Sequence, residues 1–295
     1  MMTEEALLAN ARGVAQCLGL SDADTSLVFL PLYYSYTLSQ VLSTLVAGGS
    51  LVLLRNLFFP QLVFNAIAEH RVTGFGGVPT SLNILATHRA PSAGRVESLR
   101  YILSAGGPLS PAVIDGVRTA FPGAALFNNY GCTEIGPRAT AVDYTSTPDK
   151  IGSIGRPIPG VSVTIARPDR STADVGESGE IVLSGPSLMK GYYRDPETTA
   201  SRMSRHGFHT GDYAYADAQG FLYYQGRRDD MFKSAGEKVS AREIEDVVLA
   251  LPHRLRERMQ LILTEPALLA HSQLRFAEVD RVVARHVAAR TGASP

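Results

Sequence analysis

Cysteine is scarce in this chain, and neither sign of charge is in excess. Cys17 and Cys132 are the two cysteines in 295 residues. Two thiols cannot build a disulfide framework or a zinc site, so we expect both to be reduced in a cytoplasmic protein. The 28 basic and 28 acidic side chains cancel. This balance gives no reason to expect nucleic acid or a membrane surface as a partner.

Long apolar runs and a basic leader are also missing. No uninterrupted apolar run reaches the roughly 18 residues of a membrane span. The chain opens with the acidic Glu4 and Glu5, unlike a signal or transit peptide. Hydrophobic residues make up 45% and charged residues 19%, which is typical of a globular protein. A chain of this length can bury a core and form more than one structural unit.

The first 142 residues alternate short apolar runs with helical patterns. Buried strands are expected at residues 26–30, 50–54, 73–75, 101–104 and 125–127, and helices near 3–18, 37–47, 60–70, 79–88 and 110–120. This α/β rhythm predicts a mostly parallel sheet flanked by helices. Such sheets bind ligands beyond the carboxyl ends of their strands, and residues 104–107 and 128–134 both fall after predicted strands.

After residue 143 the pattern changes. Short strands are expected at residues 161–166, 180–184 and 220–225, separated by Gly, Pro and Asp turns without a long helix between them. This spacing predicts a small antiparallel, barrel-like subdomain. A further unit begins near residue 227, with a helix from about 241 to 251. We therefore predict three parts: an α/β subdomain at 1–142, a β-rich subdomain at 143–226 and a C-terminal domain at 227–295.

The segment from Asn128 to Glu134, with the sequence Asn-Asn-Tyr-Gly-Cys-Thr-Glu, concentrates side chains that suit a nucleotide and its metal. The Asn128 amide can read an adenine edge, and the Tyr130 ring can stack on the base. Gly131 permits a positive φ or a close backbone approach. Thr133 can donate to a phosphate, and Glu134 is a hard oxygen ligand for Mg²⁺. An ordinary strand-to-helix turn is the alternative.

This segment resembles the core motif Asn-x-Tyr-Gly-x-Thr-Glu of the adenylate-forming superfamily. That superfamily contains acyl-CoA synthetases, the adenylation domains of peptide synthetases and luciferases. Further matches keep the order of the family's motifs, at residues 104–109, 152–160, 179–185, 189–193, 208–212, 226–230 and 233–245. The chain is identified as a member of this superfamily, most similar to acyl-CoA synthetases, and the resemblance covers about residues 1–250.

The resemblance implies roles for residues outside the core motif. Gly106 and Gly107 would border the nucleotide. The Asp212 carboxylate would accept hydrogen bonds from both ribose hydroxyls, and the Arg227 fork would reach ribose and phosphate. Asp229 matches the hinge about which a small domain swings between two half-reactions. Each role has an alternative. Asp212 and Asp229 can be acids of ordinary turns, and Arg227 can form a surface salt bridge.

The acid-binding pocket is expected near four residues: Tyr34, Gly76, Pro79 and Ile135. Tyr34 stands where the similar segment of acyl-CoA synthetases, Pro-Leu-Phe-His-Ser-Tyr, has histidine. The pocket segments 74–79 and 135–138 are apolar and glycine-rich. This composition disfavours a free amino acid, whose ammonium usually needs a carboxylate partner. A fatty or aromatic acid is therefore the expected substrate.

Two parts of the family's catalytic equipment have no counterpart in the sequence. The family's phosphate loop ends in Pro-Lys-Gly, and residues 1–3 resemble the stretch just downstream of it. Lys238 is the last of the four lysines in the sequence, whereas the family carries its adenylating lysine further on, in the C-terminal domain. Residues 278–281 echo the family's Lys-Val-Asp-Arg, with Glu278 in place of the lysine. We expect a chain truncated at both ends and therefore incomplete or weakly active.

The implied reaction joins an acid to a thiol in two steps. The carboxylate attacks the α-phosphate of ATP to give an acyl-adenylate, and a thiol then displaces AMP. Thr133, Glu134 and Lys233 are the expected catalytic residues, with Mg²⁺ at Glu134 and Lys233 near the thiol, although a solvated surface lysine is the alternative. CoA is the expected thiol, and the phosphopantetheine of a carrier protein is the alternative.

Three classes of function remain open from the sequence. The chain can be the larger part of a ligase that needs a complementing N-terminal fragment, including one that loads an acyl or aminoacyl group onto a carrier protein. It can be a nucleotide-binding pseudoenzyme, which binds AMP without chemistry. It can also be a gene-model fragment that folds poorly, because lost partners expose apolar faces.

Overall fold

The computed structural model describes residues 1–55, 57, 59–88, 96–227, 231–234 and 237–240, with side chains up to Arg227. The chain separates into two compact units, Met1–Tyr224 and Gln225–Pro295. In the second unit the described residues include an antiparallel hairpin of β13 (Met231–Ser234) and β14 (Glu237–Ser240). The helix expected near 241–251 lies outside the described residues, and the three-part division of the chain stays a prediction.

A seven-stranded sheet organises the first unit. Its order is β2-β1-β3-β4-β5-β6-β7, built from β1 (Thr25–Val28), β2 (Ser50–Leu53), β3 (Gly74–Gly77), β4 (Tyr101–Ser104), β5 (Ala125–Cys132), β6 (Gly136–Asp143) and β7 (Arg156–Pro157). The pairs from β2 to β5 are parallel, and β6 and β7 add antiparallel strands. All four residues of both β3 and β4 are buried, as expected for strands that are covered on both faces. The predicted, mostly parallel sheet is confirmed.

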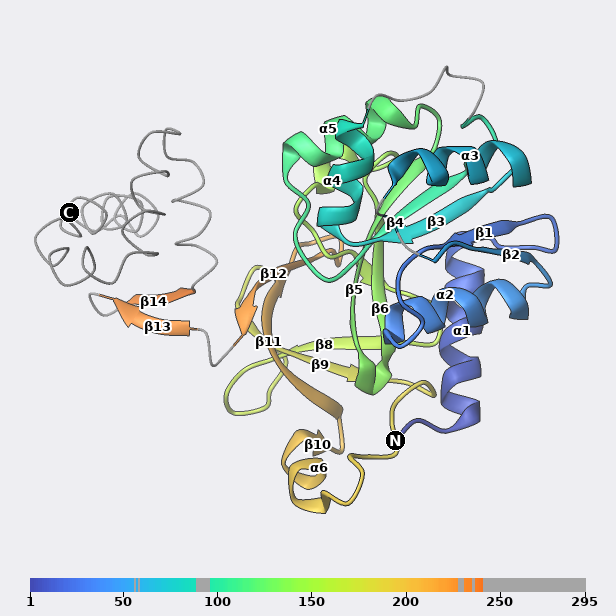
Figure 1. Cartoon of the computed structure of the whole chain (residues 1–295). Coiled ribbons are helices and arrows are strands. Elements are labelled where there is room, and N and C mark those ends of the chain that lie inside the picture. Colours follow the sequence, from blue (N-terminus) through green and yellow to red (C-terminus); the bar gives the residue numbers. More distant parts are fainter. Residues whose placement is uncertain (56, 58, 89–95, 228–230, 235–236, 241–295) are drawn as a thin grey trace, which may run out of the picture. The chain divides into compact units, whose positions relative to one another are not determined.

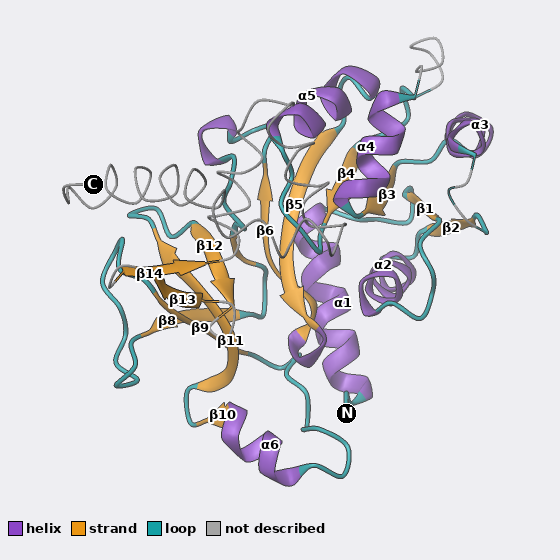
Figure 2. Ribbon diagram, turned by 60° about the vertical axis from the view of Figure 1, so that its left-hand side comes forward, coloured by secondary structure: helices purple, strands orange, loops and turns teal. Residues whose placement is uncertain are grey.

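Five helices cover the two faces of this sheet: α1 (Glu4–Leu18), α2 (Ser35–Val46), α3 (Pro60–His70), α4 (Pro79–Thr87) and α5 (Pro111–Ala120). Figures 1 and 2 show α1 and α2 on one face and α3, α4 and α5 on the other. The caps of α1 agree with the sequence, since the Thr3 hydroxyl accepts from the Ala6 amide and Gly19 ends the helix with φ 60°. Proline occupies the first turn of α3, α4 and α5, where its missing N–H costs nothing.

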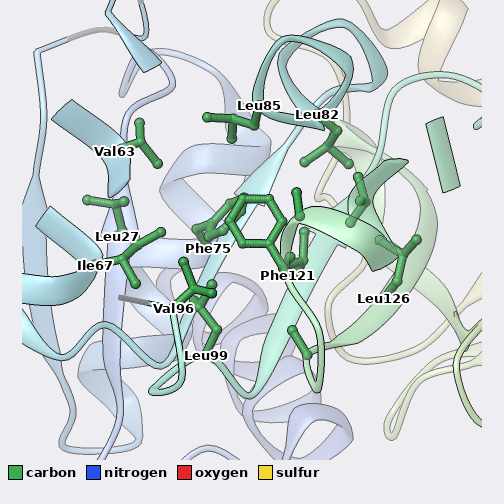
Figure 3. Close-up of a cluster of buried hydrophobic side chains, with 14 of the residues drawn as sticks. Leu27, Val63, Ile67, Phe75, Leu82, Leu85, Val96, Leu99, Phe121 and Leu126 are labelled. Carbon is green, nitrogen blue, oxygen red and sulfur yellow. The ribbon is translucent and has the colours of Figure 1, made fainter. Parts of the chain in front are cut away.

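The main hydrophobic core lies between the sheet and helices α3 to α5 (Figure 3). Phe121 stacks on Phe64 with ring centroids 5.6 Å apart and meets Phe75 edge-on at the same distance. All three rings are almost fully buried. Each such ring contributes roughly 1.5–3 kcal/mol through removal of apolar surface from water.

A second, antiparallel sheet follows along the chain. Its order is β10-β11-β9-β8 with β12 beside β11, built from β8 (Ser162–Ala166), β9 (Gly179–Ser184), β10 (Met203–Ser204), β11 (Gly207–Ala216) and β12 (Leu222–Arg227), while the short α6 (Pro196–Arg202) precedes β10. The sheet curls as a half-barrel (Figure 2), which confirms the predicted antiparallel β-rich part. No helix among the residues with described structure is both long and apolar enough to cross a membrane.

The structure corrects the expected position of the core motif. The sequence predicts that residues 128–134 follow a strand, but β5 continues through Cys132. Its partner β6 folds back after a 3₁₀ turn, η2 (Thr133–Ile135), and pairs Asn129 with Ala141 and Tyr130 with Thr140. This antiparallel ladder keeps the motif extended. Strands β6 and β11 are absent from the predicted strands because polar residues interrupt their apolar runs.

Candidate functional site

The expected ribose ligand Asp212, on β11, meets the expected base-stacking residue Tyr130, on β5. The Tyr130 hydroxyl donates to Asp212 Oδ2 at 2.7 Å, and the Tyr224 hydroxyl lies 3.4 Å from Oδ1. The two tyrosine rings are 6.1 Å apart. Burial and the adjacent Asp212 carboxylate raise the pKa of Tyr130 well above its usual value, so its hydroxyl stays protonated and donates. Asp212 thus already accepts hydroxyl donors, the kind of group that a ribose diol presents.

The expected metal ligand Glu134 is anchored by the motif at residues 189–193. The Tyr192 hydroxyl donates to Glu134 Oε1 at 2.8 Å, and the Met189 amide donates to the Glu134 carbonyl at 2.6 Å. Burial and Glu134 raise the pKa of Tyr192 to about 12, so this donor is retained at neutral pH. The two contacts fix η2 and the carboxylate that it carries.

Thr133 connects the core motif with the segment that holds Tyr34. The Thr133 side chain is exposed, and its Oγ1 lies 3.2 Å from Ser35 Oγ in the first turn of α2. Tyr34, the residue before Ser35, is 52% exposed and has its ring 4.6 Å from the ring of Tyr33. The structure therefore brings Ser35, the residue after the expected pocket residue Tyr34, into contact with the phosphate-binding candidate Thr133.

Backbone conformation explains Gly106 and close approach explains Gly131, whereas a Cβ on Gly107 would make an ordinary contact. Gly106 has φ +83°, and a Cβ on Gly107 would lie 3.4 Å from Pro79 Cγ, so the loop after β4 packs on the start of α4. A Cβ on Gly76 would lie 3.2 Å from the Tyr36 hydroxyl. A Cβ on Gly131 would lie 2.5 Å from the Pro137 backbone, so close approach explains Gly131.

The side chains of Asn128 and Ile135 are buried within the protein. Asn128 Nδ2 donates to the Tyr144 hydroxyl and to the Ser153 carbonyl, both at 3.0 Å. Its buried Oδ1 has no hydrogen-bond partner within the described part of the chain, which leaves an acceptor suited to an amino group such as that of adenine. Ile135 is fully buried in a hydrophobic cluster with Val14. Contact of either residue with a ligand stays a prediction.

Three expected site residues fall in or beside the second unit. Arg227 ends β12 and is exposed. Asp229, the expected hinge, lies outside the described residues. Lys233 is on β13, opposite Lys238 in the hairpin. The roles assigned to these three residues stay predictions.

The side chains around Glu134 suit a metal that arrives with a nucleotide. Among the residues that the structure describes, no group of three or more His, Cys, Asp or Glu side chains could hold a metal. Glu134 alone fits Mg²⁺, which proteins often hold through one or two carboxylates together with substrate phosphates.

Burial and the Glu134 charge raise the pKa of the Cys132 thiol far above its usual value, so Cys132 is not a nucleophile at neutral pH.

Comparison with known proteins identifies the class. Residues 1–193 match the family described as AMP-binding enzyme, so the chain belongs to this family and the predicted membership is confirmed. Residues 239–295 match a second family, described as MftR C-terminal domain. That match falls within the stretch of residues 227–295 that the sequence predicts to be a truncated C-terminal ligase domain.

The named relatives are a CoA synthase and a CoA ligase. Feruloyl-CoA synthase of Amycolatopsis sp is 36% identical over 253 residues, which are 85% of this chain and 51% of the relative. 2-Succinylbenzoate–CoA ligase of Bacillus subtilis (strain 168) is 32% identical over 80% of this chain and 47% of the relative. The chain spans about half the length of the curated relatives it matches.

Solved structures agree with this similarity. Unliganded O-succinylbenzoate Coenzyme A synthetase from Bacillus subtilis superposes with a TM-score of 0.78 at 31% identity, over 86% of this chain and 54% of that one. The same enzyme in complex with ATP and magnesium ion gives 0.77 at 31% identity, over 84% and 51%. These similarities confirm the expected fold, a parallel-dominant sheet followed by an antiparallel half-barrel.

Sequence reasoning missed the partners of the expected site residues. Tyr192 lies in the motif at residues 189–193, and its pairing with Glu134 spans 58 residues of sequence, which no local pattern reveals. Tyr224 lies in a predicted strand, where nothing distinguishes it from other aromatic strand residues. Ser35 follows Tyr34 in a segment whose similarity to acyl-CoA synthetases was the available signal.

Proposed function

We propose that this chain is the nucleotide- and acid-binding part of an ATP-dependent, AMP-forming acid–thiol ligase of the acyl-CoA synthetase type. The observation that carries the proposal is the meeting of Asp212 from β11 with Tyr130 from β5. Two motif residues 82 positions apart in sequence form one polar cluster. Its hydroxyl-accepting carboxylate suits a ribose.

Each site residue has a defined task in this reaction. Asp212 accepts the ribose hydroxyls, and Thr133 donates to a phosphate oxygen. Glu134, oriented by the Tyr192 hydroxyl, holds Mg²⁺, which neutralises phosphate charge when bound. Gly106 and Gly107 let the loop after β4 pass close to the nucleotide. Catalysis in this scheme consists mainly of positioning and charge stabilisation.

The acid and the thiol follow from the pocket segments and the relatives. Feruloyl-CoA synthase and 2-succinylbenzoate–CoA ligase have names that contain aromatic acids and CoA, which supports an aromatic or fatty acid and CoA for this chain. Lys233 would approach the thiol, and Arg227 the ribose and phosphate. The proposal has two alternative forms. In one, the phosphopantetheine of a carrier protein replaces CoA, and in the other the chain works together with a complementing N-terminal fragment.

The test is AMP release from ATP·Mg²⁺ in the presence of CoA and a panel of fatty and aromatic acids, followed by chromatography. Acid-dependent AMP release that falls in Glu134→Gln supports the ligase. Arg12→Met, which changes an exposed side chain of α1, serves as the matched surface control. AMP binding without any acid-dependent release, also after addition of an N-terminal fragment from a relative, would favour a nucleotide-binding pseudoenzyme.

A further inference from the structure

One buried charge in the first unit, that of Arg138, has no hydrogen-bond partner among the residues that the structure describes. Arg138, on β6, is 1% exposed and is the largest of the fully buried side chains. None of its three side-chain nitrogens, Nε, Nη1 and Nη2, hydrogen-bonds to any residue that the structure describes. No described carboxylate forms an ion pair with it. A buried guanidinium without an acceptor is costly, so a missing acceptor is expected.

Tyr36, in the first turn of α2, packs against the Arg138 guanidinium. The guanidinium lies 4.6 Å from the centroid of the Tyr36 ring, a cation–π contact that satisfies none of its N–H groups. The Tyr36 hydroxyl is also buried and without a hydrogen-bond partner in the described chain. Burial raises the pKa of Tyr36, so this hydroxyl keeps its proton. A cluster of unmatched donors suits a group that only accepts, and a carboxylate matches the guanidinium fork in two places.

The cluster lies beside the expected acid pocket. The Tyr36 hydroxyl is 3.2 Å from the position that a Cβ on Gly76 would occupy, and Gly76 is an expected pocket residue. Tyr36 directly follows Ser35, whose hydroxyl contacts Thr133 of the core motif. The first turn of α2 therefore joins the phosphate-binding candidate to the unmatched guanidinium. Along β6, Arg138 is two residues past Gly136, which places it roughly 7 Å from the end of the turn that carries Glu134.

We propose that Arg138 binds a second carboxylate of the substrate, so that the site selects a dicarboxylic acid over a monocarboxylic one. The reacting carboxylate lies at the Thr133–Glu134 turn, and the second carboxylate bridges Arg138 and the Tyr36 hydroxyl. This inference rests on the proposed function and names the class of acid that the same site takes. Tyr36 both covers Arg138 in the free protein and contributes a donor to the bound acid.

The test compares diacids with their half-esters. The purified chain is titrated calorimetrically, with and without saturating AMP, with aliphatic dicarboxylic acids of four to eight carbons and ring-carboxylated cinnamic acids. Each is paired with its distal mono-methyl ester, which keeps the shape and removes one charge. At least one diacid should bind about tenfold or more tightly than its ester, as expected for a charge-assisted bidentate pair. Equal binding of every pair would overturn the proposal.

Variants separate recognition from folding. Arg138→Met should bind diacid and ester alike, Arg138→Lys should keep part of the preference, and Arg12→Met should behave as the parent protein. AMP binding should be unchanged in all three. Without ligand, Arg138→Met should unfold at the same temperature or higher, because it removes an unmatched buried charge. Unfolding several degrees lower would assign Arg138 a structural partner and contradict the proposal.

A separate titration with AMP distinguishes the two claims. Normal AMP binding with no preference for diacids refutes the role of Arg138 and leaves the proposed ligase intact. Absence of AMP binding refutes the proposed nucleotide site, while the diacid comparison without AMP still decides whether Arg138 recognises a carboxylate.

Discussion

The two faces of the seven-stranded sheet are built in different ways. The face covered by α3, α4 and α5 is packed with apolar side chains, among them the rings of Phe64, Phe75 and Phe121. The face covered by α1 and α2 buries polar side chains that form hydrogen bonds with the backbone and with one another. Gln40 Nε2 donates to the Leu27 carbonyl, and Ser39 Oγ donates to Asn10 Oδ1.

The polar face also contains buried polar side chains that have no hydrogen-bond partner in the described chain. Asn10 Nδ2 donates to the Arg138 carbonyl, yet the Arg138 guanidinium and the Tyr36 hydroxyl have no hydrogen-bond partner among the described residues. The apolar face is explained by folding alone. Thr37 Oγ1 of α2 is also buried without a partner in the described chain, but Arg138 is the charged side chain among these unmatched residues, and a buried charge without an acceptor indicates a place for a ligand.

The apolar face should show the largest effect on stability. Phe121→Ala should lower the free energy of unfolding by about 3–5 kcal/mol, because it leaves a cavity against Phe64 and Phe75. Urea unfolding measures the change. Phe59→Ala, at a side chain that is 68% exposed, is the matched control and should change stability little. An equal loss in both variants would contradict the assignment of this core.

A buried carboxylate, Asp24, lies at the amino end of β1 and is held by polar partners as well. Burial alone would raise the pKa of Asp24, but hydrogen bonds from Thr73, the Ser21 amide and Arg100 outweigh it, and the net pKa is lowered. A lowered pKa means that Asp24 stabilises the fold above its ordinary pKa and that this contribution disappears as pH falls through the lowered value. Asp24→Asn should therefore cost about 1.5–3 kcal/mol at pH 7.

The pH dependence supplies the measurement for Asp24. In urea unfolding between pH 7 and pH 3, the gap between the parent protein and Asp24→Asn should narrow at the acidic end. Asp115→Asn, at an exposed carboxylate of α5, should run parallel to the parent protein over most of this range. A gap that stays constant down to pH 3 would show that the Asp24 charge does not contribute.

The polar face should respond to the loss of one hydroxyl. Tyr101→Phe removes the hydrogen bond to Ser26 Oγ, whose length is 2.9 Å, and should cost about 1–2 kcal/mol. Tyr193→Phe, at an exposed ring, is the control. A Tyr101→Phe variant as stable as the control would mean that this network is not a source of stability, and the contrast between the two faces would weaken.

At the carboxyl ends of the strands, Tyr192→Phe should affect the metal rather than the fold. The variant leaves Glu134 Oε1 without its 2.8 Å donor, so ATP·Mg²⁺ binding should weaken about three- to tenfold while AMP binding is unchanged. Calorimetry with both nucleotides measures this split. Equal weakening of AMP and ATP·Mg²⁺ would indicate that Tyr192 supports the adenosine part of the site instead.

Local features of the fold could be read from the sequence, whereas the pairings within the site could not. Thr3 and Gly19 predict the ends of α1 because capping depends on neighbouring residues alone. The extension of β5 through Cys132 depends on β6, whose polar residues Arg138 and Thr140 hide the strand pattern. The length of β5 therefore depends on pairing with a strand that local sequence propensity does not reveal.

The candidate site divides in the same way. The resemblance pointed to Asp212 and Glu134, because motif residues keep their order along the chain. It could not give the contacts from Tyr192 and Tyr224, which come from segments far away in sequence. The unmatched state of Arg138 is a property of its surroundings, since its burial, with no ion-pair partner among the described residues, appears only when α2 and β6 come together.

Calorimetric titration with AMP of the folded, monodisperse chain tests the central claim most directly. The account predicts that the parent protein binds AMP and that Asp212→Ala weakens binding at least tenfold, because the ribose hydroxyls lose their charged acceptor. Asp169→Ala should bind as the parent protein does. Absence of AMP binding, or equal binding by Asp212→Ala and the parent protein, would contradict a nucleotide site at Tyr130 and Asp212.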